Sequence, residues 1–296
     1  MPNLRFFYDD SEIYESDDPV FYPDPERFPE VGYVLDNYAT IRREATDYLS
    51  GTIDIPYFNP SPPKMNGPQI WRNFYFKNYS LPYRLGRRYF PETFRIFAER
   101  PEFTLAGITT LEPGGRLMSH CGETNAVIRC HVGLKVPGTL PDLGLKVNGE
   151  SVCWQEGKVL AFTDAYQHEV WNDTAESRYV LAFDIVRPEF RRYRAWICAH
   201  CLALQIVRFG LERLRMYDQT PGWLRSLLTK PFAVPLWCYL VLASIMRIAK
   251  RRASLWLARW RPRRIREERA ATFRASRAEA AGRRSRSSTG VSEPLR

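Results

Sequence analysis

NAVIRCHVGLKV, residues 125–136, is one of several short runs of β-forming residues between Phe103 and Ile185. The other runs are FTLAGITTL, LGLKV, KVLAF, HEVWN and RYVLAFDIV. Turn signals such as PGG, VPG and VNGE separate them, as between the strands of a sheet. Because several short strands at close spacing favour a sandwich or barrel, the sequence predicts a mainly β fold with a jelly-roll core.

Helices are predicted on both sides of the β-rich region. VGYVLDNYATIRREATDYLS, residues 31–50, has apolar residues at helical spacing, and PETFRIFAER, residues 91–100, predicts a second helix. Between them, IDIPYFNPSPPKMNGP, residues 53–68, predicts a loop, and IWRNFYF, residues 70–76, predicts a strand. RRYRAWICAHCLALQIVRFGLERLRMYD, residues 191–218, predicts a long amphipathic helix after the β region.

The chain is therefore expected to contain four parts. These are an extended lead-in over residues 1–30, the β-rich domain over 31–190, a helical segment over 191–250 and a basic, partly disordered tail over 251–296. The start, MPNLRFFYDDSE, lacks the basic and apolar regions of a secretory signal, and the six cysteines show no repeated spacing. Both features favour a reduced, cytoplasmic-facing location.

The positive charge lies almost entirely near the carboxyl end. Residues 247–296 hold 16 Lys or Arg and 4 Asp or Glu, which leaves 27 and 29 for the rest of the chain. The charge therefore describes the partners of the tail and says little about the fold. No specific nucleic-acid partner is expected, because a disordered basic tail binds nucleic acid without selectivity.

An uncharged stretch before this tail suggests contact with a membrane. PFAVPLWCYLVLASIM, residues 231–246, is shorter than the roughly 20 residues that a span needs. Pro231 and Pro235 favour an interrupted helix. With the Trp-rich basic residues that follow, the stretch predicts an interfacial or re-entrant anchor on an anionic membrane surface. The alternative is a helix buried under the β core.

Two of the four histidines, His120 and His168, are candidates for a metal site. His120 follows a Pro-Gly-Gly turn and His168 begins a late strand, and a jelly-roll brings distant strands together. Neutral imidazole binds Fe, Zn and Cu. Non-haem iron sites usually add a carboxylate, but the expected position holds Gly122. From spacing alone, two ordinary core or surface histidines remain an alternative.

Arginines accompany the histidines. Arg129 and His131 alternate on one strand, so their side chains share a face, and Arg178 begins a later strand. Buried arginines need anionic partners, and a small dicarboxylate would supply them through forked hydrogen bonds. Salt bridges to Asp164 or Glu169 are the structural alternative.

HCGETNAVIRCHVGLKVP, with WQEGKVLAFTDAYQHEVWNDTAESRYVLAFDIVRPE, resembles the catalytic domain of the aspartyl/asparaginyl β-hydroxylase family over roughly residues 70–190. That family comprises Fe(II)- and 2-oxoglutarate-dependent dioxygenases on a double-stranded β-helix. The resemblance implies that His120 and His168 bind iron. Glycine at Gly122 agrees with the family's animal members, in which water takes the place of the third ligand.

The same resemblance implies how the cosubstrate is bound. Arg178 matches the arginine that binds the distal carboxylate of 2-oxoglutarate, and Arg129 and His131 match groups around the metal-proximal carboxylate. Thr109 stands where the family has a serine that assists the distal carboxylate. Trp71 loosely matches an aromatic residue near the pocket.

The implied reaction consumes 2-oxoglutarate and O₂ and hydroxylates an unactivated C–H bond, giving succinate and CO₂. The resemblance slightly favours an Asp/Asn-type side chain of a protein or peptide as substrate, for which Arg72 and Lys77 are candidate cations. The alternatives are an acyl chain of a membrane lipid, as in bacterial relatives, and a non-catalytic pseudoenzyme. Halogenation at the open position beside Gly122 is a minor alternative.

Two further features have simpler explanations. CAHC, with Cys198, His200 and Cys201, has the form of half a zinc site, but no second pair lies nearby, so a packed helix face is predicted. His131 is a formal third metal ligand, but as a strand neighbour of Arg129 it is expected to contact the cosubstrate.

Overall fold

The computed structural model describes residues 3–52 and 71–260. The predicted loop over residues 53–68 and most of the predicted disordered tail lie outside the described residues. The chain divides into two compact units, Met1–Val241 and Leu242–Arg296. This division does not coincide with the boundaries expected from the sequence at residues 190 and 250.

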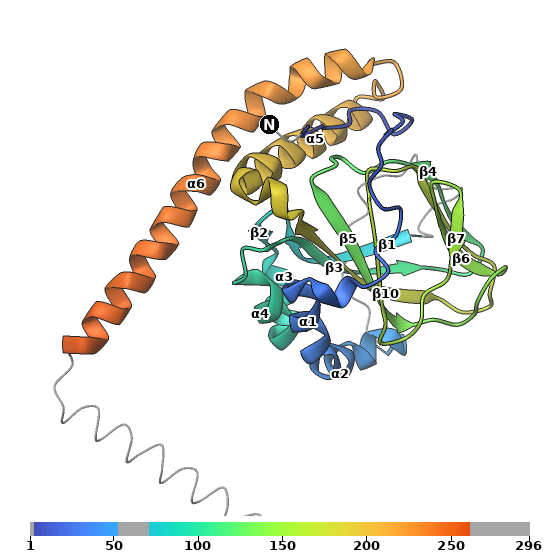
Figure 1. The fold of residues 1–296 in the computed structure, drawn as a ribbon, viewed down its shortest axis with the longest axis horizontal. Coiled ribbons are helices and arrows are strands. Elements are labelled where there is room, and N and C mark those ends of the chain that lie inside the picture. Colours follow the sequence, from blue (N-terminus) through green and yellow to red (C-terminus); the bar gives the residue numbers. More distant parts are fainter. Residues whose placement is uncertain (1–2, 53–70, 261–296) are drawn as a thin grey trace, which may run out of the picture. The chain divides into compact units, whose positions relative to one another are not determined.

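Two antiparallel sheets form the core of the first unit (Figure 1). The large sheet has the order β2 (Leu81–Pro82), β1 (Trp71–Asn78), β3 (Phe103–Leu111), β10 (Arg178–Val186), β5 (Val127–Lys135) and β8 (Val159–Phe162). The small sheet has the order β4 (Gly115–His120), β9 (His168–Asn172), β6 (Leu143–Val147) and β7 (Glu150–Val152). Apart from the β1–β2 and β6–β7 pairs, neighbouring strands are not consecutive in the sequence, which confirms the predicted jelly-roll core.

The large sheet is covered on both faces. Helices α1 (Pro29–Asp36), α2 (Tyr38–Leu49) and α4 (Pro91–Ala98) bury apolar side chains against its outer face. Its inner face turns toward the small sheet across a second apolar cluster. Every residue of β3 and β10 is therefore buried, as expected for central strands covered on both sides.

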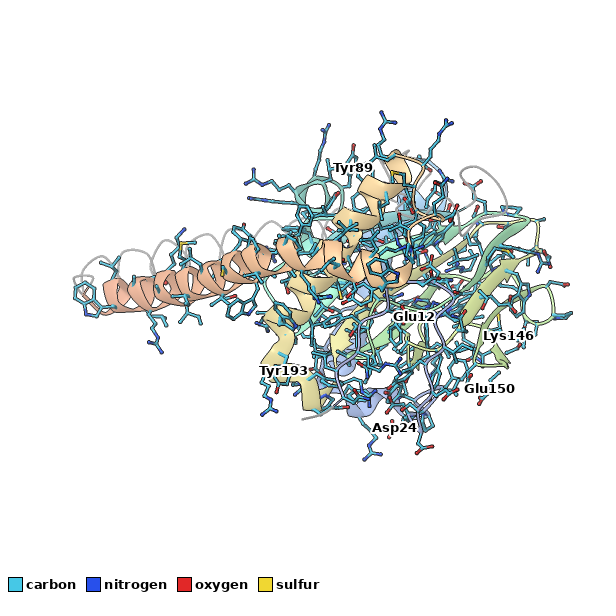
Figure 2. The ribbon with its side chains drawn as sticks, turned by 90° about the horizontal axis from the view of Figure 1, so that it is seen from above. Glu12, Asp24, Tyr89, Lys146, Glu150 and Tyr193 are labelled. Carbon is cyan, nitrogen blue, oxygen red and sulfur yellow. The ribbon has the colours of Figure 1, made fainter. Side chains whose placement is uncertain are left out.

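The small sheet ends in a charged edge. Lys146 and Glu150 are exposed on the β6–β7 hairpin (Figure 2). Charged side chains on an edge strand discourage pairing with another chain. The site described below lies between the inner faces of the two sheets, away from the helices α1, α2 and α4.

The remaining short helices connect these parts. They are η1 (Pro25–Arg27), α3 (Arg84–Tyr89) and η3 (Pro188–Tyr193). Two long helices follow the last strand, α5 (Arg194–Arg213) and α6 (Gly222–Trp260). The CAHC stretch lies on α5, where Cys198 and Cys201 are fully buried and His200 stacks on Phe6 with ring centroids 3.9 Å apart. This placement agrees with a packed helix face.

The prediction of an interrupted helix at Pro231 and Pro235 is wrong. Both prolines lie inside the continuous helix α6. Each proline removes only one backbone donor and so leaves most helical hydrogen bonds in place. Two helical stretches, Pro188–Arg213 and Gly222–Leu257, are long and apolar enough to cross a membrane, but this follows from length and composition alone.

Candidate metal and cosubstrate site

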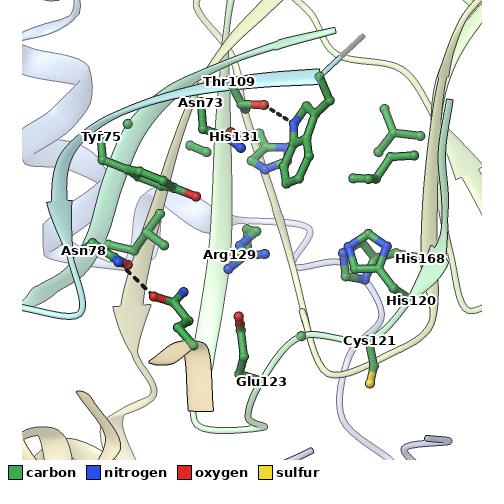
Figure 3. Close-up of a pocket in the computed structure, with 18 of the residues that line it drawn as sticks. Asn73, Tyr75, Asn78, Thr109, His120, Cys121, Glu123, Arg129, His131 and His168 are labelled. Carbon is green, nitrogen blue, oxygen red and sulfur yellow. Dashed lines mark hydrogen bonds between the residues drawn. The ribbon is translucent and has the colours of Figure 1, made fainter. Parts of the chain in front are cut away.

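The two candidate metal-binding histidines meet between neighbouring strands of the small sheet. His120 ends β4, His168 begins β9, and the two are partners in the strand register. Their ring centroids are 4.2 Å apart, and both side chains are buried (Figure 3). The structure thus brings together two residues that are 48 positions apart in the sequence.

Backbone carbonyls orient both imidazoles in the same way. His120 Nδ1 lies 2.7 Å from Met118 O, and His168 Nδ1 lies 2.9 Å from Tyr166 O. A carbonyl can only accept, so each Nδ1 carries the proton and each Nε2 carries the lone pair. Metal-binding histidines are usually held by such a bond on the other ring nitrogen. The pair therefore fits a divalent transition metal such as Fe(II).

A carboxylate fills the space beside Gly122. A Cβ atom at Gly122 would lie 1.9 Å from Asp164 Oδ2. Asp164 Oδ1 lies 3.5 Å from His168 Nε2 and 2.7 Å from a terminal nitrogen of Arg129. The Asp164 carboxylate therefore occupies the space that a side chain at residue 122 would take. Sequence reasoning named Asp164 only as a salt-bridge partner of the arginines.

Adding a methyl group at Gly122 is expected to disturb this site. In Gly122→Ala the new Cβ must displace the Asp164 carboxylate, at a cost of about 1–3 kcal/mol in unfolding free energy. We also expect weaker metal binding, because the displaced carboxylate lies next to His168. Urea denaturation and Mn(II) titration measure the two effects. Gly210→Ala is the matched control, since nothing lies within 4 Å of its added Cβ; wild-type behaviour of Gly122→Ala would contradict the argument.

Arg129 is bound by two carboxylates of the protein itself. Its Nε and one terminal nitrogen donate to Asp184 at 2.9 and 2.8 Å, and the other terminal nitrogen pairs with Asp164. Burial alone would lower the pKa of Arg129, but the two carboxylates raise it well above its ordinary value. Arg129 is thus held by salt bridges to protein carboxylates, which was the structural alternative to binding a dicarboxylate. It lines the pocket with its charge already compensated.

Arg178 has no such compensation. Its side chain is 2% exposed and lines the pocket. No carboxylate among residues 3–52 and 71–260 forms an ion pair with it, and its Nε has no hydrogen-bond partner there. Its guanidinium lies over the ring of Trp154, 4.6 Å from the centroid. Burial lowers the pKa of Arg178 to about 9, so at neutral pH the pocket contains a buried cation that lacks an anion.

His131 lies on the same inner face as Arg178. Trp154 Nε1–H donates to His131 Nδ1 at 3.2 Å. Burial and the nearby Arg178 and Arg129 charges lower the pKa of His131 well below its ordinary value. The ring is therefore neutral and carries its proton on Nε2, which suits a donor to an oxygen ligand and disfavours a third metal ligand.

Thr109 and Trp71 are joined to each other. Trp71 Nε1–H donates to Thr109 Oγ1 at 2.7 Å, and both residues line the pocket. Arg72 does not line it, because successive strand residues point to opposite faces. Its guanidinium pairs with Glu112. Lys77 Nζ is buried against backbone carbonyls, one of them Phe97 O at 3.2 Å. The assignment of Arg72 to the substrate pocket is therefore wrong.

The pocket is larger than the predicted site. Its volume is about 190 Å³. Beyond the histidines it is lined by residues that sequence reasoning missed: Asn73, Tyr75, Asn78, Glu123, Gln205 and Phe209. Alternation with Trp71 along β1 would have indicated Asn73 and Tyr75. The α5 residues give no signal in the sequence.

The N-terminal strap, residues 3–22, holds the loops of both histidines. Cys121 N–H donates to Asp10 O at 3.2 Å, and Gln167 Nε2 donates to the same carbonyl at 2.8 Å. Cys121 directly follows one histidine and Gln167 directly precedes the other. One backbone group of the strap therefore fixes both histidine-bearing loops.

The helices in turn hold the strap. Arg208 on α5 pairs with the Asp10 carboxylate. Arg225 on α6 donates to Tyr8 O at 2.8 Å and pairs with Asp9. The strap is thus fixed between the two histidine-bearing loops and the first unit's helical part.

The sequence is similar to those of known proteins. Among curated relatives, the ornithine lipid ester-linked acyl 2-hydroxylase of Rhizobium tropici is 32% identical over 173 residues, which cover 57% of this chain and 61% of the relative. The human aspartyl/asparaginyl beta-hydroxylase is 34% identical over 106 residues, or 33% of this chain and 14% of the relative. The chain thus spans less than two thirds of either relative.

Solved structures show only distant likeness. HygX from Streptomyces hygroscopicus, with nickel and 2-oxoglutarate bound, is 11% identical with a TM-score of 0.34, over 50% of this chain and 79% of that one. Such a score supports no inference about ligands. The family model for aspartyl/asparaginyl beta-hydroxylase, in contrast, matches residues 35–188, which is more than half of the chain and includes both histidines and Arg178. The chain belongs to the aspartyl/asparaginyl β-hydroxylase family.

Proposed function

We propose that the protein is an Fe(II)- and 2-oxoglutarate-dependent hydroxylase. The observation that carries this proposal is Arg178, a buried guanidinium without an anion in the same pocket as two oriented histidines. A dicarboxylate that reached the metal with one end would place its other carboxylate on Arg178. Membership in a family named for hydroxylation supports the same reaction class.

Each residue of the site has a distinct task in this proposal. His120 and His168 hold Fe(II), which with 2-oxoglutarate and O₂ supplies the oxidation of an unactivated C–H bond. Arg178, assisted by the Thr109 hydroxyl, binds the distal carboxylate. His131 donates its Nε2 proton toward the other end of the cosubstrate. Asp164 adds negative charge beside the iron cation. Residue 122 cannot supply this charge, because it is a glycine.

Apolar walls complete the site. Leu117, Leu145, Phe162 and Val170 line the pocket around the histidines. They keep water away from the carbon that is to be oxidised, which strengthens the polar contacts inside and prevents side reactions.

For the substrate, the pocket supports an acyl chain of a membrane lipid over the Asp/Asn-type side chain. A substrate carboxylate would need a cation, but Arg129 and Arg208 are already paired with carboxylates, and Arg72 and Lys77 do not line the pocket. A curated relative named as an acyl 2-hydroxylase of a lipid supports this choice. The Asp/Asn-type side chain remains the second candidate, supported by the relatives that carry its name.

Delivery of such a substrate would need a membrane surface. On α6, Trp223, Leu227, Phe232 and Trp237 are 41% to 70% exposed. Basic residues follow from residue 247 onward. Exposed apolar side chains followed by cations suit an anionic bilayer on its cytoplasmic side. We therefore propose that the protein acts at that surface.

Lipid-stimulated turnover tests the proposal. With Fe(II), 2-oxoglutarate and O₂, we expect the full chain to form succinate slowly alone and several-fold faster with anionic vesicles of bacterial lipid extract. Succinate assay with mass spectrometry of the lipids measures both events. Equal turnover with and without vesicles would contradict the lipid substrate and favour a peptide substrate. Bound metal and 2-oxoglutarate without turnover under any condition would support a pseudoenzyme.

A further inference from the structure

The side chain of Gln167 joins the two histidine-bearing loops. Gln167 directly precedes His168, and Ser119 directly precedes His120. Ser119 Oγ donates a hydrogen bond to Gln167 Oε1 at 2.9 Å. Neither Gln167 nor Ser119 lines the pocket. This hydrogen bond therefore constrains the spacing of the two histidine backbones from outside the pocket.

The amide nitrogen of Gln167 binds the N-terminal strap. Its Nε2 donates to Asp10 O at 2.8 Å and to Glu12 O at 2.9 Å. A carbonyl only accepts, so both amide hydrogens are used toward the strap and the amide oxygen is left for Ser119. Cys121 N–H reaches the same Asp10 carbonyl at 3.2 Å. One side chain therefore connects the strap with the loops of both histidines.

Two buried arginines of the helices bind the same part of the strap, which runs between the helices and the sheets (Figure 1). Arg208 of α5 pairs with the Asp10 carboxylate, and Arg225 of α6 donates to Tyr8 O at 2.8 Å. Tyr217 accepts from both guanidinium groups, from Arg208 through its hydroxyl at 2.8 Å and from Arg225 through its carbonyl at 2.9 Å. Hydrogen bonds from a charged donor are about twice as strong as neutral ones. The strap is therefore held at Tyr8 and Asp10 by side chains that are themselves fixed.

This support lies largely outside the part of the chain that matches the family model. The model matches residues 35–188, whereas the strap precedes that range and the helices α5 and α6 follow it. The spacing of the two histidines thus depends on segments on both sides of the matched range, in addition to the strands that carry the histidines.

We propose that Gln167 is a positioning residue of the metal site, and that Arg208 and Arg225 act on the same site through the strap. The affinity of two imidazoles for one metal ion depends on their spacing, because both must reach the same ion. Groups that orient metal ligands without touching the metal contribute about 10–100-fold to metal affinity. The inference rests on the proposed function, since it requires that His120 and His168 bind the metal.

Gln167→Met tests the role of the amide. Methionine has a similar length and no charge, but it cannot donate to the strap. We expect the variant to bind Mn(II) about tenfold more weakly than the wild type. In the metal-free protein, peptides that contain Cys121 should exchange amide hydrogens faster, because Asp10 O is then less firmly held. Electron paramagnetic resonance of Mn(II) and hydrogen-exchange mass spectrometry measure the two effects, and Gln219→Met, at an exposed glutamine, is the matched control.

Arg225→Ala tests the route through the strap. Arg225 does not line the pocket, so a change in metal affinity has to pass through Tyr8 and the rest of the strap. We expect Mn(II) affinity to fall several-fold, with faster exchange around Cys121, and Arg225→Lys to recover part of both. Arg191→Ala removes a pair with Glu30 outside the strap and should keep wild-type values.

The outcomes separate this inference from the proposed function. Wild-type Mn(II) affinity in both Gln167→Met and Arg225→Ala would overturn the inference, whatever their thermal stability, while the proposed function stands. Weaker Mn(II) binding without faster exchange around Cys121 would also overturn it, because the strap would not be the cause. If the wild-type chain itself does not bind Mn(II), the proposed function is refuted.

Discussion

A His120→Ala protein should bind Mn(II) more than about 100-fold more weakly than the wild type, and its succinate formation should be lost. Outer-shell partners of a metal already contribute about 10–100-fold to affinity, so a direct ligand should contribute more. His168→Ala should retain part of the affinity, because Asp164 Oδ1 lies 3.5 Å from His168 Nε2 and can approach the vacated position.

Electron paramagnetic resonance of Mn(II) titrations measures both affinities directly. Thermal unfolding of the metal-free proteins is the control, since the two rings pack against each other in the same wall. Equal and intact metal binding by wild type, His120→Ala and His168→Ala would refute the metal site.

Arg178→Ala should weaken 2-oxoglutarate binding by about 100-fold. Truncating one partner of a buried charge pair costs about 2–5 kcal/mol, and each 1.4 kcal/mol is a factor of ten. The same change should leave the ligand-free protein as stable as the wild type or more stable, because Arg178 is a buried cation without an anion. This combination separates a binding role from a structural one.

Fluorescence or calorimetric titration with 2-oxoglutarate, together with thermal unfolding, measures the two effects. Arg178→Lys should recover part of the affinity, because lysine keeps the charge but loses the forked geometry. Arg116→Ala is a suitable control, since this arginine pairs with Asp173 near the surface. A destabilised Arg178→Ala protein with unchanged 2-oxoglutarate affinity would contradict the assignment.

The sequence predicted those parts of the molecule that local pattern determines. Strands such as β3 and β10 were visible as runs of β-forming residues, and the fold class and family followed from them. The convergence of His120 and His168 followed from the expected jelly-roll. These inferences need only periodicity and the rule that distant strands pair in this topology.

Other features depend on side-chain packing and were not predictable. Gly122 and Asp164 are 42 residues apart, and only the fold reveals that one fills the space of the other. Arg129 and Arg178 looked equivalent in the sequence, but one meets two carboxylates and the other none among the described residues. Arg72 was misassigned because its neighbour Trp71 faces the pocket and strand alternation turns Arg72 away.

We expect the N-terminal strap to be among the last parts of the molecule to dock during folding. Its bonds join residues far apart in the chain: Asp10 meets Gln167 and Arg208, and Tyr8 meets Arg225. Contacts between such distant residues close late in folding, because the entropy of loop closure must be overcome first. The β core can therefore form before the two histidine loops are fixed. Metal affinity should accordingly be the last property to return on refolding, after the circular dichroism signal of the sheets.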